Sequence, residues 1–185
     1  MVTIRPFETK DRERVQALCI ENAECNDASD ELKQFILLMY CNYYIEQEPE
    51  NCFVAVDDAD QAIGYIFCAQ DCEYYEKRFT DIYLQQTMAL GLKYYIDAKL
   101  DLITHSMFKK HYPAHLHIDI FNDYQGQGIG GALLQTLKKH LMAKGIMSCM
   151  LVCGADNAGA IRFYEKNGYT QLLTTHLGTA MGIEF

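Results

Sequence analysis

Hydrophobic and polar positions follow two different periods along this chain. Alternation with a period of two predicts a strand, and apolar residues repeating every three or four positions predict a helix. The segments with strand character are residues 3–7, 52–56, 62–69, 114–121, 147–153, 169–174 and 179–185. The segments with helical character are residues 8–24, 30–46, 129–144 and 157–166, and Ser29 is a good N-cap for the second of them.

The stretch of residues 71–112 lies between the third and fourth expected strands and shows little alternation. Phe79, Tyr83, Met88 and Leu92 fit helical spacing instead, so two or three helices are expected there. Helices that interleave with strands indicate an α/β or α+β class with a mixed sheet. A length of 185 residues suits one domain, and we expect residues 1–185 to form it.

Charge and composition exclude several classes of protein. Lys and Arg number 16 and Asp and Glu 25, so the net charge is −9, which argues against a nucleic-acid binder and against docking on an anionic membrane. No apolar run reaches the roughly 18 residues that span a bilayer, and the first residues lack the apolar stretch of a signal peptide. A cytoplasmic protein is therefore expected.

The eight cysteines are scattered, and no Cys-x-x-Cys pair occurs. A structural zinc site needs two matched pairs of close ligands, which the chain does not offer. We therefore expect reduced, buried thiols and no metal.

The fourth expected strand carries titratable side chains on one face. His115, His117 and Asp119 point one way, because side chains alternate along a strand. Histidine has an ordinary pKa of about 6.5 and suits a general base. The alternative for His117 and Asp119 is hydrogen bonding to neighbouring strands or loops.

A glycine-rich run follows this strand and opens a helix. Glycines there leave backbone N–H groups unpaired at the positive end of the helix dipole, which makes an anion site. The run also matches the dinucleotide fingerprint, but residues 146–150 lack the acidic residue which that fold needs. The run comprises Gln125, Gly126, Gln127, Gly128, Ile129, Gly130 and Gly131.

A second block begins at Asn157 and continues through Phe163-Tyr164 to Gly168-Tyr169. Together the two blocks, about 30 residues apart, resemble the GCN5-related N-acetyltransferase (GNAT) superfamily. The resemblance implies a mixed, mostly antiparallel central sheet with flanking helices. This chain departs from the family pattern by a helical insertion, residues 71–112, between the third and fourth strands.

The resemblance implies an acetyl-CoA-dependent N-acetyltransferase, with direct attack by an amine in a ternary complex. It places the pyrophosphate on the glycine loop, the pantetheine arm beside the fourth strand, and Tyr164 where it can protonate the departing thiolate. His117 and Asp119 are the candidate bases, and water or main-chain carbonyls are the alternative. The implied donor-binding residues are Ile118, Asp119, Ile120, Gln125, Gly126, Gln127, Gly128, Ile129, Gly130, Gly131, Asn157 and Tyr164.

The resemblance implies a small amine or a peptide amine as the acceptor, and a homodimer is possible because dimers are common in the family. Together with the aromatic helix of residues 30–46, the insertion is expected to wall the acceptor pocket. Tyr74, Tyr75, Tyr94 and Tyr95 are candidate lining residues, and the alternative for each of them is plain packing onto the core. Residues 112–120 are also similar to the acetyltransferase-like domain attached to O-GlcNAc hydrolases. The alternative function is therefore a non-catalytic module that binds coenzyme A or another ligand.

Overall fold

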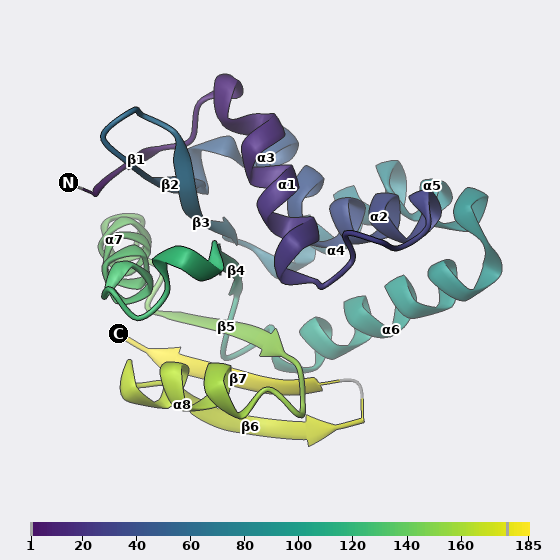
Figure 1. Ribbon diagram of the computed structural model, residues 1–185. Coiled ribbons are helices and arrows are strands. Elements are labelled where there is room, and N and C mark those ends of the chain that lie inside the picture. The colour runs from purple at the N-terminus through teal and green to yellow at the C-terminus, as the bar shows by residue number, and fades with distance from the viewer. Residues whose placement is uncertain (1, 177) are drawn as a thin grey trace.

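The computed structural model describes residues 2–176 and 178–185 (Figure 1). Within these residues the strands form a seven-stranded mixed sheet in the order β1-β2-β3-β4-β5-β7-β6. Every pairing is antiparallel except β4–β5, as the resemblance implied. The strands are β1 (Thr3–Pro6), β2 (Phe53–Val56), β3 (Ala62–Ala69), β4 (Ala114–Ile120), β5 (Ser148–Cys153), β6 (Thr170–Thr175) and β7 (Gly178–Glu184).

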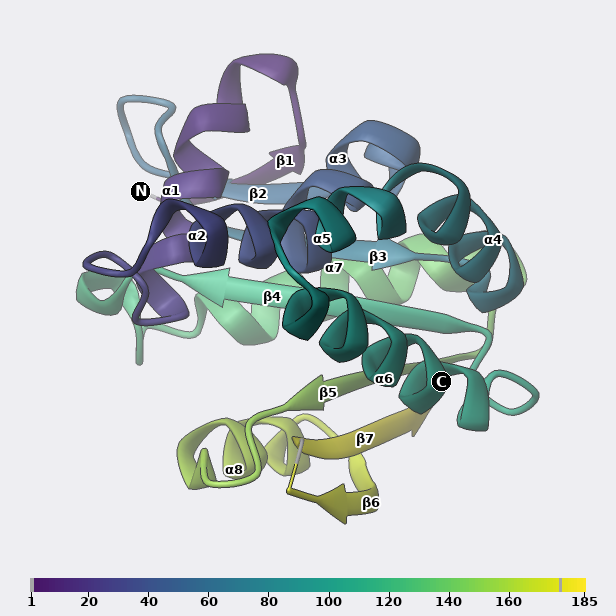
Figure 2. The same cartoon turned by 90° about the vertical axis from the view of Figure 1, so that its right-hand side faces the viewer.

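Helices cover both faces of the sheet, and Figure 2 shows α7 behind the sheet and α1 to α6 in front of it. No helix in the described part of the chain is long and apolar enough to cross a membrane. The α-helices are α1 (Arg12–Asn22), α2 (Asp30–Leu37), α3 (Tyr43–Gln47), α4 (Cys72–Ile82), α5 (Leu84–Leu90), α6 (Leu92–Phe108), α7 (Ile129–Ala143) and α8 (Ala158–Lys166). The shorter helical segments are the 3₁₀ turns Thr9–Asp11, Pro49–Asn51 and Asn122–Tyr124 and the π-helical segment Leu38–Asn42.

The predicted helix at residues 30–46 is confirmed in extent but not in regularity. Ser29 accepts a hydrogen bond from the Leu32 N–H at 3.3 Å and so caps α2. The π-helical segment Leu38–Asn42 then separates α2 from α3. Such segments are rare and often lie at functional sites, and this one carries Tyr40.

Buried side chains divide into two clusters, one on each face of the sheet. On β3, Tyr65 and Phe67 join the cluster under α1 to α6, whereas Ile66 and Cys68 join the cluster under α7 and α8. The eight cysteines are free thiols, and all except the half-buried Cys153 are buried. This agrees with their expected role as small apolar residues.

Strands β4 and β5 are the feature of the sheet that shapes the site. Their parallel pairing is limited to Ala114 with Cys149 and His115 with Met150, although β4 pairs with β3 as far as Ile120. Figure 2 shows the two strands diverging toward their C-terminal ends. The facing edges beyond His115 and Met150 therefore lack a strand partner.

The insertion is helical, as predicted, and consists of α4, α5 and α6. Tyr75, Phe79 and Tyr83 are at most 1% exposed and belong to the cluster that also contains Tyr65 of the sheet. By contrast, Leu92, Ile96 and Leu100 of α6 are 62%, 48% and 38% exposed, although they recur at helical spacing. The insertion is thus built into the core through α4, and the apolar stripe of α6 faces outward.

A substitution in α4 tests whether the insertion belongs to the core. Phe79→Leu should lower the free energy of unfolding by about 1–2 kcal/mol, because Phe79 is fully buried and the smaller side chain leaves part of its space empty. Tyr74→Leu on the same helix is the matched control, and it should cost less than about 0.5 kcal/mol because Tyr74 is 47% exposed. Urea denaturation measures both. Equal effects would contradict the core assignment.

Candidate active site

A cavity of about 380 Å³ lies between the diverging strands β4 and β5. Its walls come from both strands, the turn after β5, α8, α6 and the segment from the π-helix into α3. The cavity therefore brings together His117, Ile118, Asp119, Asn157 and Tyr164, which the sequence singled out. The lining residues are Tyr40, Tyr44, Asp101, His105, Leu116, His117, Ile118, Asp119, Leu151, Val152, Cys153, Gly154, Asn157, Ala160 and Tyr164.

The glycine run lies outside this cavity, between the end of β4 and the start of α7. Gly126 has a φ of +74° and Gly128, the N-cap of α7, a φ of +81°, a left-handed conformation that favours glycine. A Cβ added at either glycine would meet nothing within 4 Å. Across the described residues, no N–H group of residues 126–131 has a hydrogen-bond acceptor. The run therefore presents open, unpaired donors at the positive end of a helix.

The Gln125 side chain stabilises this loop. Its Nε2 donates to the Ile120 carbonyl at 3.1 Å and to the Asn122 Oδ1 at 3.0 Å, and its own N–H donates to the Asn122 carbonyl at 3.2 Å. Gln125 therefore ties the start of the loop to the end of β4. The free N–H groups begin at the next residue, Gly126.

The two sequence blocks meet at a contact between α7 and α8. A Cβ added at Gly130 would lie 2.8 Å from the Phe163 Cζ, so the Phe163 ring would have to shift. The absence of a side chain at Gly130 therefore allows this close approach. The contact joins the two sequence blocks in space.

The His117 side chain is oriented by two tyrosines and a carboxylate. The Tyr65 hydroxyl donates to the Asp119 Oδ2, and it lies 3.1 Å from the His117 Nδ1. Because the single proton of Tyr65 is engaged by Asp119, Nδ1 of His117 is the donor in the second contact, which leaves Nε2 with a free lone pair. Tyr40 stacks on the His117 ring, with centroids 5.1 Å apart and planes at 19°. This arrangement gives a positioned imidazole with an available basic nitrogen.

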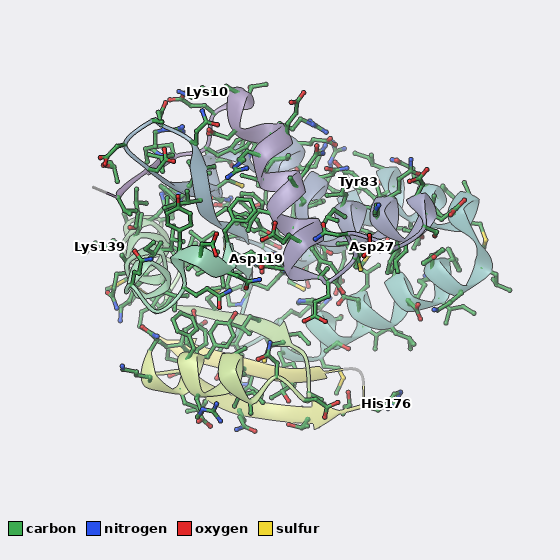
Figure 3. The ribbon with its side chains drawn as sticks, in the orientation of Figure 1. Lys10, Asp27, Tyr83, Asp119, Lys139 and His176 are labelled. Carbon is green, nitrogen blue, oxygen red and sulfur yellow. The ribbon has the colours of Figure 1, made fainter. Side chains whose placement is uncertain are left out.

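Asp119 lies in the middle of the molecule, below α1 (Figure 3). Burial raises the pKa of its carboxyl above the ordinary value, and His117, Tyr65 and Asn22 oppose this shift. The His117 Nδ1 lies 3.6 Å from the Asp119 Oδ2. Tyr65 is therefore the group that contacts both this carboxylate and His117.

Tyr164 and Asn157 enter the cavity from α8 and its N-terminus. Tyr164 is only 8% exposed and contacts Phe163 and Tyr169 edge-on. Its hydroxyl makes no hydrogen bond to any described residue, and burial raises the pKa of the phenol above its ordinary value. Asn157 caps α8 by accepting a hydrogen bond from the Ala160 N–H at 2.9 Å. Tyr164 is thus a protonated phenol with an uncommitted hydroxyl.

Two polar side chains of α6, Asp101 and His105, were not predicted from the sequence, and His105 packs against His115 of β4. His105 donates from Nδ1 to the Asp101 carbonyl at 3.0 Å, and this nitrogen lies 3.3 Å from the Asp101 Oδ2. Its ring packs 4.3 Å from the ring of His115. Burial, with the nearby His105 and His117, lowers the pKa of His115 well below the ordinary value, so His115 is a neutral core side chain.

The prediction about the insertion is correct for the helix and wrong for the tyrosines. Tyr74 is exposed, Tyr75 is fully buried in the core, and Tyr94 and Tyr95 pack against the core cluster, so none of them lines the cavity. Asp101 and His105 of α6 do so instead, with Tyr40 and Tyr44. The available signal was the spacing of Asp101 and His105, which lie one helical turn apart.

Comparison with known proteins adds independent information. A 37% identical stretch of 59 residues matches an acetyltransferase of Sodalis glossinidius, and it covers 32% of this chain but only 42% of that relative's length. N-alpha-acetyltransferase 30 of Schizosaccharomyces pombe is 25% identical over 169 residues, which cover 91% of this chain and 84% of that protein.

Solved structures share the fold along its whole length. The structure of SsHAT superposes with a TM-score of 0.87 and 25% identity, covering 99% of this chain and 98% of that one. The PaiA N-acetyltransferase from Thermoplasma acidophilum, solved in complex with coenzyme A, gives a TM-score of 0.64 at 19% identity, with coverage of 100% and 99%. The model of the acetyltransferase (GNAT) family matches residues 15–169. With the diverging strands, the glycine loop and this match over most of its length, the chain belongs to the GNAT family of acetyltransferases.

Proposed function

We propose that this protein transfers an acetyl group from acetyl-CoA to an amine by direct attack in a ternary complex. One observation carries the proposal. The unpaired N–H groups of residues 126–131 come directly after β4, and the free edge of β4 borders the cavity. This cavity contains the oriented imidazole of His117 and the uncommitted phenol of Tyr164. An anion site, a strand edge and an acid–base pair are the elements that a phosphate-bearing, amide-containing thioester requires.

The residues present fit such a donor. The open space at Gly126 and Gly128 admits a phosphate to the main chain. From Leu116 to Ile120 the β4 edge that faces β5 has no strand partner, so it can bind the amides of an extended arm. Asn157 lines the same cavity. We propose that the donor-binding residues are those implied by the family resemblance, with the Gln125 side chain holding the loop.

The chemistry then follows from two side chains. When bound, acetyl-CoA supplies a reactive thioester. His117 accepts a proton from the attacking amine at Nε2, while Tyr65 and Asp119 hold Nδ1–H in place. The nitrogen–carbon bond forms, the carbon–sulfur bond breaks, and Tyr164 donates a hydrogen bond or proton to the sulfur that leaves. His117 then releases its proton to solvent, and a phenolate left at Tyr164 takes one up from solvent, so both side chains return to their starting state. Because burial raises the pKa of Tyr164, the phenol keeps its proton throughout the neutral range.

A direct assay tests this function. Purified protein is mixed with acetyl-CoA and a panel of primary amines, and both thiol release and the acetylated amine are measured. Stoichiometric formation of both products is expected with at least one class of amine. Donor binding without either product would overturn the proposal in favour of a non-catalytic binding module.

The donor site predicts a charge effect at Gly128. Gly128→Asp should lower acetyl-CoA affinity at least about tenfold, because its carboxylate would face the pyrophosphate across the open space of the loop. Gly128→Asn is the matched control, since it has the same shape without the charge and Asn tolerates a positive φ. Calorimetry on both folded variants measures the difference. Equal affinities would show that the pyrophosphate lies elsewhere.

A further inference from the structure

The cavity has a charge distribution that the proposed reaction does not require. Asp119 on β4 and Asp101 on α6 both line it, and its lining within the described residues includes no Lys or Arg. Tyr40 and Tyr44 form part of the same wall. His105 faces the Oδ2 of Asp101 and His117 that of Asp119, and no permanently charged cation among the described lining residues opposes either carboxylate. Carboxylates and aromatic rings in such a wall favour a positively charged ligand.

Asp101 has unused binding capacity. Its Oδ2 faces the His105 Nδ1 at 3.3 Å, whereas its Oδ1 has no partner among the described residues. The Asp101 side chain is 18% exposed, so a ligand in the cavity can reach it. His105 is only 6% exposed, and its Nε2 also lacks a hydrogen-bond partner in the described part of the chain. The Asp101 Oδ1 can therefore accept a hydrogen bond from a cationic group of a ligand in the cavity.

Tyr40 connects this end of the cavity to the reaction centre. It stacks on His117, and burial together with the charge of Asp101 raises the pKa of its hydroxyl. Tyr40 belongs to the π-helical segment Leu38–Asn42 and lines the same cavity as Asp101. One residue of this wall therefore contacts His117 in the cavity that Asp101 also lines.

We propose that the acceptor is a primary amine that carries a second cationic group, which Asp101 binds while the reacting nitrogen lies at His117. This inference rests on the proposed function and specifies its substrate class. Asp101 on α6 holds the second charge away from the reacting nitrogen, and Tyr40 lines the cavity that contains both groups. A monoamine leaves the Asp101 Oδ1 without a partner, and an acceptor with a carboxylate at this position is repelled by Asp101.

The experiment compares pairs of substrates. Short α,ω-diaminoalkanes, each paired with the n-alkylamine of the same carbon number, serve as acceptors, and kcat/KM is measured for both members of each pair. The best diamine should exceed its monoamine at least about tenfold, which corresponds to one charge-assisted contact. Asp101→Asn should reduce this ratio to within about twofold, because the diamine loses its second contact. Tyr40→Leu should also reduce the ratio.

Asp81→Asn is the matched control, because Asp81 is an exposed carboxylate of the same insertion, on α4, and does not line the cavity. The Asp81→Asn variant should keep the full preference for the diamine over the monoamine. Calorimetric binding of both amines in the presence of coenzyme A separates the subsite from catalysis. If no amine is acetylated, the proposed function fails, yet tighter binding of the diamine that depends on Asp101 still supports the subsite. Equal binding of both amines by the unsubstituted protein overturns it.

Discussion

Replacing His117 with alanine should lower kcat/KM for the acceptor about 10²-fold to 10³-fold, the range expected for loss of a general base. The reason is the fixed orientation of the ring, which Tyr65 contacts at Nδ1 and Tyr40 holds by stacking, so that Nε2 is available for the amine proton. Acetyl-CoA affinity should change little. Steady-state kinetics with calorimetry on the same variant measures both quantities.

Two further measurements separate catalysis from packing at His117. The alanine variant leaves space between Tyr40 and Tyr65, so added imidazole should raise its rate at least tenfold. A tenfold increase corresponds to about 1.4 kcal/mol of activation free energy. Tyr65→Phe keeps the ring but removes the hydroxyl that Asp119 and His117 share, and its effect should be smaller than that of losing the base. A rate within twofold of the unsubstituted protein for His117→Ala would show that water or the main chain carries the proton.

Tyr164→Phe should lower kcat about 10²-fold and leave acetyl-CoA affinity nearly unchanged. The phenol is 8% exposed and has no hydrogen-bond partner among the described residues. Removing the oxygen therefore costs no internal hydrogen bond, and the fold should be retained. The loss of rate would then report the interaction with the departing sulfur.

The pH dependence of this variant provides a second test. Burial raises the pKa of Tyr164 above the ordinary value of about 10 for tyrosine. The phenol is protonated below that pKa, so the ratio of wild-type to Tyr164→Phe kcat should stay constant from neutral pH to about pH 9. A ratio that falls across this range would mean that Tyr164 loses its proton there. If the kcat of Tyr164→Phe stays within twofold of that of the unsubstituted protein at all pH values, water supplies the proton to the departing sulfur.

The sequence predicted most of the elements because local rules determine them. Ser29 caps its helix as expected. The alternation of residues 114–121 placed His115, His117 and Asp119 on one face of the strand, and in the structure this is the face that α1 to α6 cover. The glycine run identified the start of α7, since positive φ angles at Gly126 and Gly128 are a local requirement. The family resemblance added the sheet topology, which spacing alone does not contain.

The insertion shows where local pattern stops being informative. Helical periodicity correctly predicted helices in residues 71–112, but it could not say which face of α6 is buried. The apolar stripe of Leu92 and Ile96 faces outward, whereas the polar His105 is buried against His115. Which side of a helix is buried depends on the neighbour it packs against, and that neighbour is set by chain topology.

By itself, the sequence determined the order of the elements, the glycine loop and the shared strand face of His117 and Asp119, because each rests on spacing within one short segment. Tyr164 became a candidate through the family resemblance. Only the tertiary structure decided how they act together. Tyr65 on β3 sets the tautomer of His117, and the π-helical segment places Tyr40 against the same ring. Asp101 enters the cavity from a helix that no motif identifies. These contacts join residues far apart in the chain, so they exist only once the sheet and its two helical layers have packed.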